Sequence, residues 1–127
     1  MKLDHVAMYV KDLEAARDFF IRFFGAKSNE MYHNPKTGLK TFFLTFEGGS
    51  RLEIMTRPEV SQAPQEPFRA GYAHISFSLG GREKVDALTD ALRLEGCEVA
   101  SEPRLTGDGY YESCVVGPEG CRIEISE

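Results

Sequence analysis

Hydrophobic and polar residues alternate along the start of the chain and then follow a helical period. Residues 3–10 alternate and predict a strand, because successive side chains of a strand point to opposite faces. Residues 13–24 place apolar side chains at helical spacing, with Asp12 as the N-cap and Gly25 beyond the C-terminus. Further strands are predicted at residues 27–33, 39–46 and 50–56, with turns at Asn34-Pro35 and Gly48-Gly49.

The second half of the chain repeats this order, which indicates an internal duplication. A helix is predicted at residues 82–95, with Val85, Leu88 and Leu92 facing inward and Gly96 ending it. The strands predicted after it are residues 97–101, 110–116 and 121–126. We therefore expect a first module at residues 1–57, a linker with three prolines at 58–70 and a second module at 71–127.

One histidine and one glutamate recur at equivalent places in the two halves. His5 and His74 each lie in the opening strand, and Glu53 and Glu124 each lie in the closing strand. His5 and Glu53 are 48 positions apart, and His74 and Glu124 are 50 apart. In all four strands, alternation puts aliphatic residues on one face and the His or Glu on the other. That second face is either solvated or lines a cavity, and we favour a cavity.

Two imidazoles and two carboxylates form a mixed nitrogen and oxygen ligand set for a divalent metal such as nickel, cobalt, iron, manganese or zinc. Taken alone, a strand histidine is more often structural, and a strand glutamate is more often solvated or paired with an arginine such as Arg51 or Arg122. The joint recurrence favours a metal site made of His5, Glu53, His74 and Glu124. The third histidine, His33, precedes the Asn-Pro turn and is expected at the surface.

Composition narrows the function classes. The chain has 127 residues, which suits one domain or two small modules, and no apolar run approaches the roughly 20 residues that span a bilayer. A net charge of −5 excludes a basic stripe for nucleic acid or a membrane surface. The N-terminus lacks a signal-peptide core, and the three cysteines show no zinc spacing, so we expect reduced thiols and a cytoplasmic protein. Cys121 is expected to be a small core residue.

The residues resemble the vicinal oxygen chelate superfamily, which includes glyoxalase I, methylmalonyl-CoA epimerase, fosfomycin-resistance thiol transferases, extradiol dioxygenases and bleomycin-sequestering proteins. The resemblance covers the whole chain. Its most specific segments are Asp4-His5-Val6, residues 71–75 and residues 117–124. It implies an α+β fold of tandem βαβββ modules, in which a curved mixed sheet forms a half-barrel around the metal.

Within this superfamily, the His/Glu/His/Glu set is similar to bacterial glyoxalase I, a lactoylglutathione lyase of the nickel- or cobalt-activated class. The resemblance implies proton transfer through a metal-bound enediolate, with Glu124 as the shuttling base and Glu53 as a ligand that can share this role. The reaction would convert the hemithioacetal of a 2-oxoaldehyde and a thiol, such as glutathione, into a 2-hydroxyacyl thioester. Relatives often build the site between two chains, so we expect a homodimer.

Two positions differ from the residues usual in bacterial glyoxalase I, so the identity of the substrate stays open. Tyr9 stands where bacterial glyoxalases usually have an arginine for a glutathione carboxylate, and Arg57 stands near their usual asparagine. Alternatives are another thiol carrier, an epimerase or thiol transferase, and a protein that sequesters a small molecule. The expected substrate-binding residues are Tyr9, Arg57, Ser76 and Tyr110. The segment 103–111 is either a mobile flap or an ordinary exposed connection.

Overall fold

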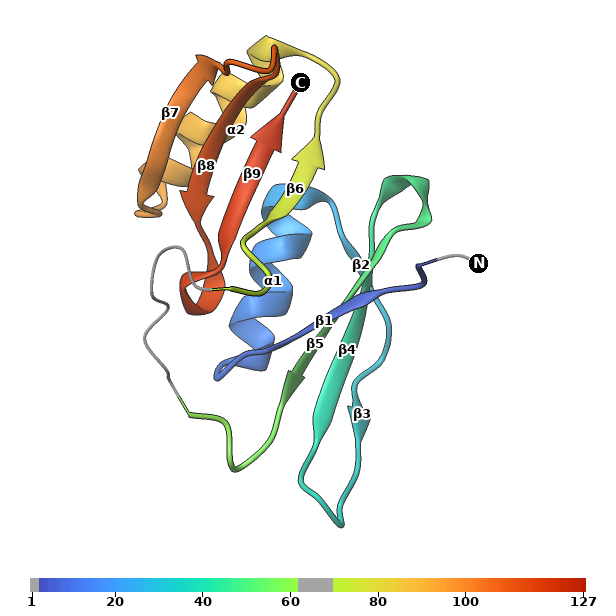
Figure 1. The fold of residues 1–127 in the computed structure, drawn as a ribbon. Coiled ribbons are helices and arrows are strands. Elements are labelled where there is room, and N and C mark those ends of the chain that lie inside the picture. The colour runs from blue at the N-terminus through green and yellow to red at the C-terminus, as the bar shows by residue number, and fades with distance from the viewer. Residues whose placement is uncertain (1–2, 62–69) are drawn as a thin grey trace. The chain divides into compact units, whose positions relative to one another are not determined.

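The order of the helices and strands repeats once along the chain, as the sequence predicts (Figure 1). The computed structural model describes residues 3–61 and 70–127, and the chain divides into two units, Met1–Ala63 and Pro64–Glu127. Most of the predicted linker, including Pro64 and Pro67, lies outside the described residues. None of the described helices is long and apolar enough to cross a bilayer.

Unit 1 is a mixed five-stranded sheet with one helix. Its elements are β1 (Val6–Tyr9), α1 (Leu13–Phe24), β2 (Lys27–Ser28), β3 (Tyr32–His33), β4 (Lys40–Thr45), the short 3-10 helix η1 (Glu47–Gly49) and β5 (Arg51–Thr56). The strand order is β1-β5-β4-β2, and β3 also pairs with β4. β1 and β5 are parallel, while the other pairs are antiparallel. The first and last long strands of the unit are therefore neighbours.

Unit 2 has the same plan with four strands. Its elements are β6 (Ile75–Ser78), α2 (Arg82–Leu94), β7 (Val99–Leu105), β8 (Tyr111–Val116), the 3-10 helix η2 (Pro118–Gly120) and β9 (Arg122–Ser126). The strand order is β6-β9-β8-β7, and β6 runs parallel to β9. The α+β class with two βαβββ modules is thus confirmed.

One face of each sheet packs under the helix of its own unit. Phe20 of α1, Leu44 of β4 and Ile54 of β5 are fully buried in unit 1. Unit 2 has the equivalent core, formed by Val85, Leu92, Val115, Ile123 and Ile125. The alternation expected from the sequence is present, because the residues between these positions on β5 and β9 are only half-buried or exposed. Each sheet therefore has one polar face that its own helix does not cover.

The predicted strand at residues 27–33 is wrong, since it is split into β2 and β3. Asn29 lies at the break, and its side-chain oxygen accepts a hydrogen bond from the backbone N–H of Phe43 at 2.7 Å. The backbone N–H of Asn29 also donates to the carbonyl of Phe43 at 3.2 Å. An asparagine side chain thus replaces part of the regular ladder along β4, which interrupts the strand.

The segment 103–111 contains the end of β7, the start of β8 and the five-residue connection between them. Residues up to Leu105 belong to β7, and β8 begins at Tyr111. The short connection is closed by Thr106, whose N–H donates to the carbonyl of Tyr110 at 2.8 Å. The Thr106 hydroxyl accepts from the N–H of Tyr110 at 3.0 Å. Residues 106–110 thus form a hydrogen-bonded connection between two antiparallel strands, and a flap role for this segment stays a prediction.

Candidate metal centre

The first His and Glu pair lies on the polar face of the unit 1 sheet. β1 and β5 run parallel with Ala7 opposite Glu53, and His5 lies two residues before Ala7. His5 is therefore a diagonal neighbour of Glu53. Its Nε2 lies 3.6 Å from Oε2 of Glu53, and the two side chains are 35% and 17% exposed. The edge of the His5 ring also contacts Phe43, with ring centroids 5.1 Å apart.

The second pair has the same register in unit 2. β6 and β9 run parallel with Ser76 opposite Glu124, and His74 lies two residues before Ser76. Nε2 of His74 lies 3.5 Å from Oε2 of Glu124. The sequence places both histidines inside their strands, but each lies one residue before the strand begins. The duplicated sequence thus builds the same diagonal His and Glu pair twice.

The spacing within each pair suits two ligands of one cation. Nitrogen and oxygen ligands lie about 2.1 Å from zinc, so two of them at tetrahedral or octahedral angles are roughly 3.0–3.4 Å apart. The observed 3.6 and 3.5 Å are slightly longer. Within residues 3–61 and 70–127, no three His, Cys, Asp or Glu side chains are grouped so that they could hold a metal ion. The structure therefore shows two separate His and Glu pairs, and each pair is a candidate half-site.

Asp4 supports His5 from the other side of the imidazole ring. Nδ1 of His5 lies 2.8 Å from Oδ2 of Asp4, which also accepts a hydrogen bond from Arg51. The Arg51 guanidinium lies over the ring of Phe43, 4.8 Å from its centroid. The hydrogen bonds from His5 and then Arg51 lower the pKa of the Asp4 carboxyl. The sequence analysis assigned Asp4 no role, although a carboxylate next to a ligand histidine is a usable signal.

In unit 2 the supporting hydrogen bond is made to Glu124, not to His74. The hydroxyl of Ser76 donates to Oε1 of Glu124 at 2.8 Å. Ala73 and Ser76 stand at the positions of Asp4 and Ala7 in the repeat, so each unit has one polar supporting side chain. Ser76 was expected to bind substrate, and the structure places its hydroxyl on a candidate metal ligand.

The polar face of unit 1 continues from the half-site to a cationic group. Tyr9 shares the face of His5, is 48% exposed and is hydrogen-bonded to Arg57. The Nε of Arg57 donates to Oε2 of Glu59 at 2.7 Å, which raises the pKa of Arg57 and lowers that of Glu59. The structure thus brings together the two predicted substrate-binding residues of this unit. Tyr9 lies opposite Met55, about 7 Å along the sheet from Glu53, and Arg57 lies four residues, about 13 Å, from Glu53.

The polar face of unit 2 also carries a carboxyl and a thiol that the sequence analysis did not select. Cys114 lies directly opposite Glu124, and Glu112 lies two residues away on the same strand. Burial, followed by repulsion from Glu124, raises the pKa of Glu112. Burial likewise raises the pKa of the Cys114 thiol. Only the pairing of β8 with β9 reveals that these groups adjoin Glu124.

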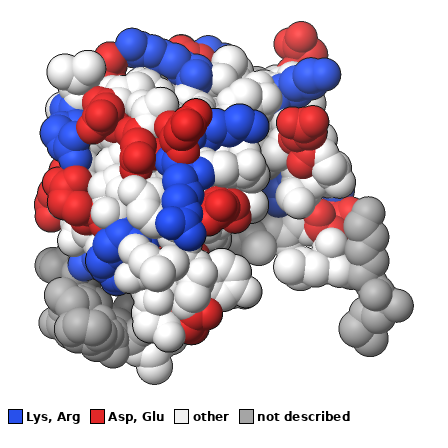
Figure 2. Space-filling model, turned by 90° about the horizontal axis from the view of Figure 1, so that it is seen from above, with Lys and Arg blue, Asp and Glu red and all other residues white. Residues whose placement is uncertain are grey.

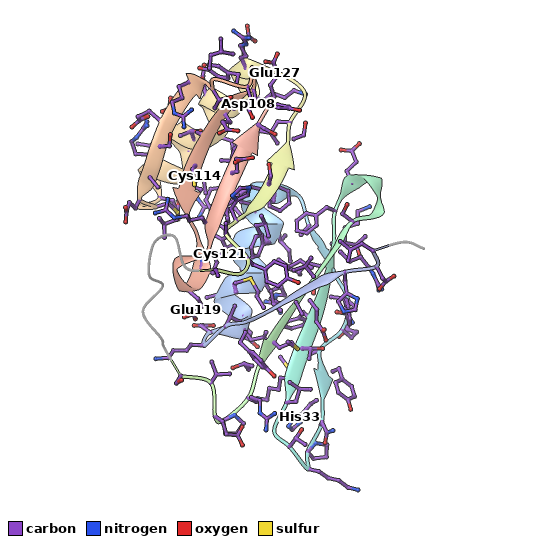
Figure 3. All side chains as sticks on the ribbon, in the orientation of Figure 1. His33, Asp108, Cys114, Glu119, Cys121 and Glu127 are labelled. Atoms are coloured by element: carbon purple, nitrogen blue, oxygen red, sulfur yellow. The ribbon has the colours of Figure 1, made fainter. Side chains whose placement is uncertain are left out.

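Several other predicted residues lie away from the half-sites. His33 is exposed in the short hairpin between β3 and β4, as expected (Figure 3). Tyr110 is 60% exposed in the β7–β8 connection, four residues from Cys114 and so about 13 Å along the ladder from Glu124. Cys121 is half-buried beside the turn that contains Glu119, and burial raises its pKa.

A pocket of about 400 Å³ in unit 1 lies beside the start of α1 and does not include the half-site. Lys11, Met31 and Lys40 are among its lining residues. On the face shown in Figure 2, the acidic and basic side chains that are drawn in colour are interspersed.

The duplicated fold agrees with a comparison against protein families. The model of the glyoxalase/bleomycin resistance protein/dioxygenase superfamily matches residues 2–125. The chain belongs to this superfamily. Its members include metal-dependent enzymes, and this membership supports the paired fold across the whole chain.

Individual relatives of the glyoxalase superfamily agree on the fold and differ in function. The uncharacterized protein YqjT of Bacillus subtilis is 26% identical over 130 residues, which cover 97% of this chain and 96% of that protein. The trypanothione-dependent glyoxalase I of Leishmania major superposes with a TM-score of 0.81 at 21% identity, covering 100% of this chain and 86% of that chain. The fosfomycin resistance protein FosX of Listeria monocytogenes, solved with Mn(II) and sulfate, gives a TM-score of 0.74 at 23% identity, covering 98% and 90%.

Proposed function

We propose that this protein is a metal-dependent lyase or isomerase of the glyoxalase I type. One divalent cation, with nickel or cobalt favoured over zinc, manganese or iron, would be held by His5, Glu53, His74 and Glu124. The observation that carries the proposal is the diagonal His and Glu pair, which recurs at the same register with nitrogen–oxygen distances of 3.6 and 3.5 Å. The same assignment applies whether the two pairs come from one chain or from two chains of a homodimer.

The donor chemistry supports this assignment. Neutral imidazole and carboxylate ligands suit the borderline divalent metals, and neither half-site contains a thiolate. A cation bound there would polarise adjacent oxygens of a substrate and acidify the neighbouring C–H bond. In each unit the pair lies on the sheet face opposite to the one that packs under the unit's own helix.

Glu124 is the proposed base, and Glu53 the proposed ligand that can share this role. The hydroxyl of Ser76 holds Oε1 of Glu124 at 2.8 Å, while Oε2 points toward His74. We assign Oε1 of Glu124 as the atom that takes the proton from the substrate carbon. A carboxylate oxygen can accept a second hydrogen bond in addition to that from Ser76, and the Ser76 hydroxyl keeps Oε1 oriented. In this role Glu124 takes a proton from the hemithioacetal carbon and returns it to the adjacent carbon. The substrate is thereby isomerised to a 2-hydroxyacyl thioester without an external oxidant.

The substrate end of the site is assigned to Tyr9 and Arg57 on the same face of unit 1, where Arg57 is ion-paired with Glu59. Arg57 and Tyr9 offer a guanidinium and a phenol, which suit a carboxylate on the thiol carrier. Tyr110 is assigned to the outer part of the substrate in unit 2. Because Arg57 replaces the residue type usual in bacterial glyoxalases, a thiol carrier other than glutathione is compatible with this assignment.

The decisive experiment changes Glu124 to Gln. Removing the proton acceptor should lower kcat by about 10²- to 10⁴-fold, the usual contribution of general acid–base catalysis, while the far-UV circular dichroism spectrum remains unchanged. Glu98→Gln, on an exposed residue away from the half-sites, is the matched control and should retain full turnover. Wild-type turnover in Glu124→Gln would reject Glu124 as the base.

The assay uses methylglyoxal with glutathione and then with other small thiols, on protein restored with each metal in turn. Turnover of an epoxide with a thiol would point to the alternative of a thiol transferase. Racemisation of a 2-substituted acyl thioester would point to an epimerase. Ligand binding that survives complete chelation would indicate a protein that sequesters a small molecule without a metal.

A further inference from the structure

The two candidate half-sites differ in which ligand has an outer partner. In unit 1 the histidine is supported, because Nδ1 of His5 lies 2.8 Å from the carboxylate of Asp4. In unit 2 the glutamate is supported by Ser76, and the residue before His74 is Ala73, which has no polar side chain. The two repeats can therefore be compared directly, because His5 follows an aspartate and His74 follows an alanine.

Hydrogen-bond chemistry determines the direction of the contact between His5 and Asp4. An ionised carboxylate can only accept, so Nδ1 of His5 must carry the proton. A neutral ring with its proton on Nδ1 leaves a lone pair on Nε2, the atom that lies 3.6 Å from Glu53. That is the tautomer that a metal ligand bound through Nε2 requires.

Asp4 is itself held in place by a longer chain of contacts. Arg51 donates to the same Oδ2 of Asp4 and lies over the ring of Phe43, 4.8 Å from its centroid. The edge of the His5 ring meets Phe43 with an interplanar angle of 87°. Asp4 and Phe43 thus both contact the imidazole, and Arg51, which comes from β5, 47 residues after Asp4, contacts both of them.

We propose that Asp4 is a positioning residue, which fixes the Nδ1-protonated tautomer of His5 and aims its Nε2 toward Glu53, while Arg51 orients Asp4. The metal-binding consequence of this inference rests on the proposed function, but the tautomer itself does not. Within residues 3–61 and 70–127, no carboxylate supports Nδ1 of His74 as Asp4 supports His5, so His74 should exchange between its two tautomers. The half-site of unit 1 is therefore pre-organised for a metal, and the half-site of unit 2 adapts its histidine when the metal binds.

The test reads the tautomers directly in the full-length protein after chelation. Nitrogen-15 correlation spectra of the imidazoles, at a pH where the rings are neutral, report which nitrogen carries the proton. In the wild type His5 should be protonated at Nδ1, and His74 should show a mixture. Asp4→Ala should convert His5 to a mixture while leaving His74 unchanged. An unchanged His5 spectrum in Asp4→Ala would overturn the proposal.

Two further variants separate a positioning role from a general effect on folding. Asp4→Glu keeps the carboxylate and should retain a larger Nδ1-protonated fraction of His5 than Asp4→Ala. Ala73→Asp transplants the carboxylate to the second repeat and should shift His74 toward Nδ1 protonation. If Asp4→Ala fails to fold, Asp4→Asn gives the same reading, because the amide accepts more weakly and cannot pair with Arg51 as a charge. Identical His5 spectra in Asp4→Asn and the wild type would then overturn the proposal.

Titration with Ni²⁺ links the tautomer to the proposed metal site. Removing an outer partner of a metal-ligating histidine typically costs 10- to 100-fold in affinity, so Asp4→Ala should raise the Kd by about that factor. A wild-type protein that binds no Ni²⁺ would contradict the proposed metal site, while the tautomer spectra would still decide whether Asp4 positions His5. The two conclusions can therefore fail separately.

Discussion

The turn before the closing strand of each unit requires a positive φ, and the two units place different residue types at that position. Glu119 has φ of 56° and is the one described residue other than glycine with a positive φ. The equivalent residue in the first half is Gly48, with φ of 81°. Side chains with a Cβ are disfavoured in this left-handed region, whereas glycine enters it freely. The tight turn before the closing strand is therefore strained in unit 2 and relaxed in unit 1.

Exchanging these residue types should change stability in opposite directions. Glu119→Gly removes the left-handed penalty but adds flexibility to the unfolded chain, so we expect a net gain of about 0.5 kcal/mol. Gly48→Ala places a Cβ at a positive φ and should cost about 1 kcal/mol. Urea unfolding of each variant gives both values. Destabilisation by Glu119→Gly would show that the Glu119 side chain contributes more than its backbone costs.

At the scale of elements, the two helices start differently. Asp12 caps α1, and its side-chain oxygen accepts from the N–H of Ala15 at 2.9 Å. α2 has Gly81 at its N-cap with no side-chain hydrogen bond. Space is open where a Cβ would be added to Gly81, and its φ of 169° is extended backbone that any residue adopts. Helix α2 depends instead on its packing, which includes the buried hydrogen bond between Thr89 and Ser113 at 2.6 Å.

A substitution can therefore remove the side-chain N-cap of α1, and another can add a side-chain N-cap to α2. Asp12→Ala should destabilise the protein by about 1 kcal/mol, because an N–H of the first turn loses its acceptor. Gly81→Asp should stabilise it by about 0.5 kcal/mol, through a new acceptor and a less flexible unfolded chain. Thermal and urea unfolding measure both effects. Equal stability of Asp12→Ala and the wild type would contradict the capping role.

At the scale of the whole molecule, the proposed metal would draw two ligands from each unit. Such binding should stabilise the folded state, since a ligand that binds only the folded protein shifts the unfolding equilibrium. With free Ni²⁺ at 100 times its Kd, the gain should be about 2.7 kcal/mol. Addition of a chelator should reverse it. Unfolding temperatures measured with and without Ni²⁺ test this expectation.

Histidine variants show whether both half-sites serve one cation. His5→Ala and His74→Ala should each abolish most of the Ni²⁺ stabilisation, although the two residues lie in different units. His33→Ala, which removes an exposed histidine, is the control and should keep the full gain. Retention of about half the gain in each of the first two variants would instead indicate independent sites.

The sequence by itself determined the features that depend on local periodicity. The bounds of α1, its cap at Asp12 and the alternation along the strands follow from residues that are close along the chain. The similar spacing from His to Glu in the two halves also indicated that these residues occupy equivalent positions of a duplicated unit. These patterns can be recognised in the sequence because side-chain direction repeats every two residues in a strand and every 3.6 residues in a helix.

Only the tertiary structure decided which side chains meet across the strands. The contact of Arg51 with Asp4 and that of Ser76 with Glu124 join residues 47 and 48 positions apart, and both depend on the register of parallel strands. The approach of Cys114 to Glu124 depends on the register of the antiparallel strands β8 and β9, and the break at Asn29 depends on its contact with Phe43 of β4. A shift of one residue would turn every side chain to the opposite face, and burial of the aliphatic faces under the helices selects one register.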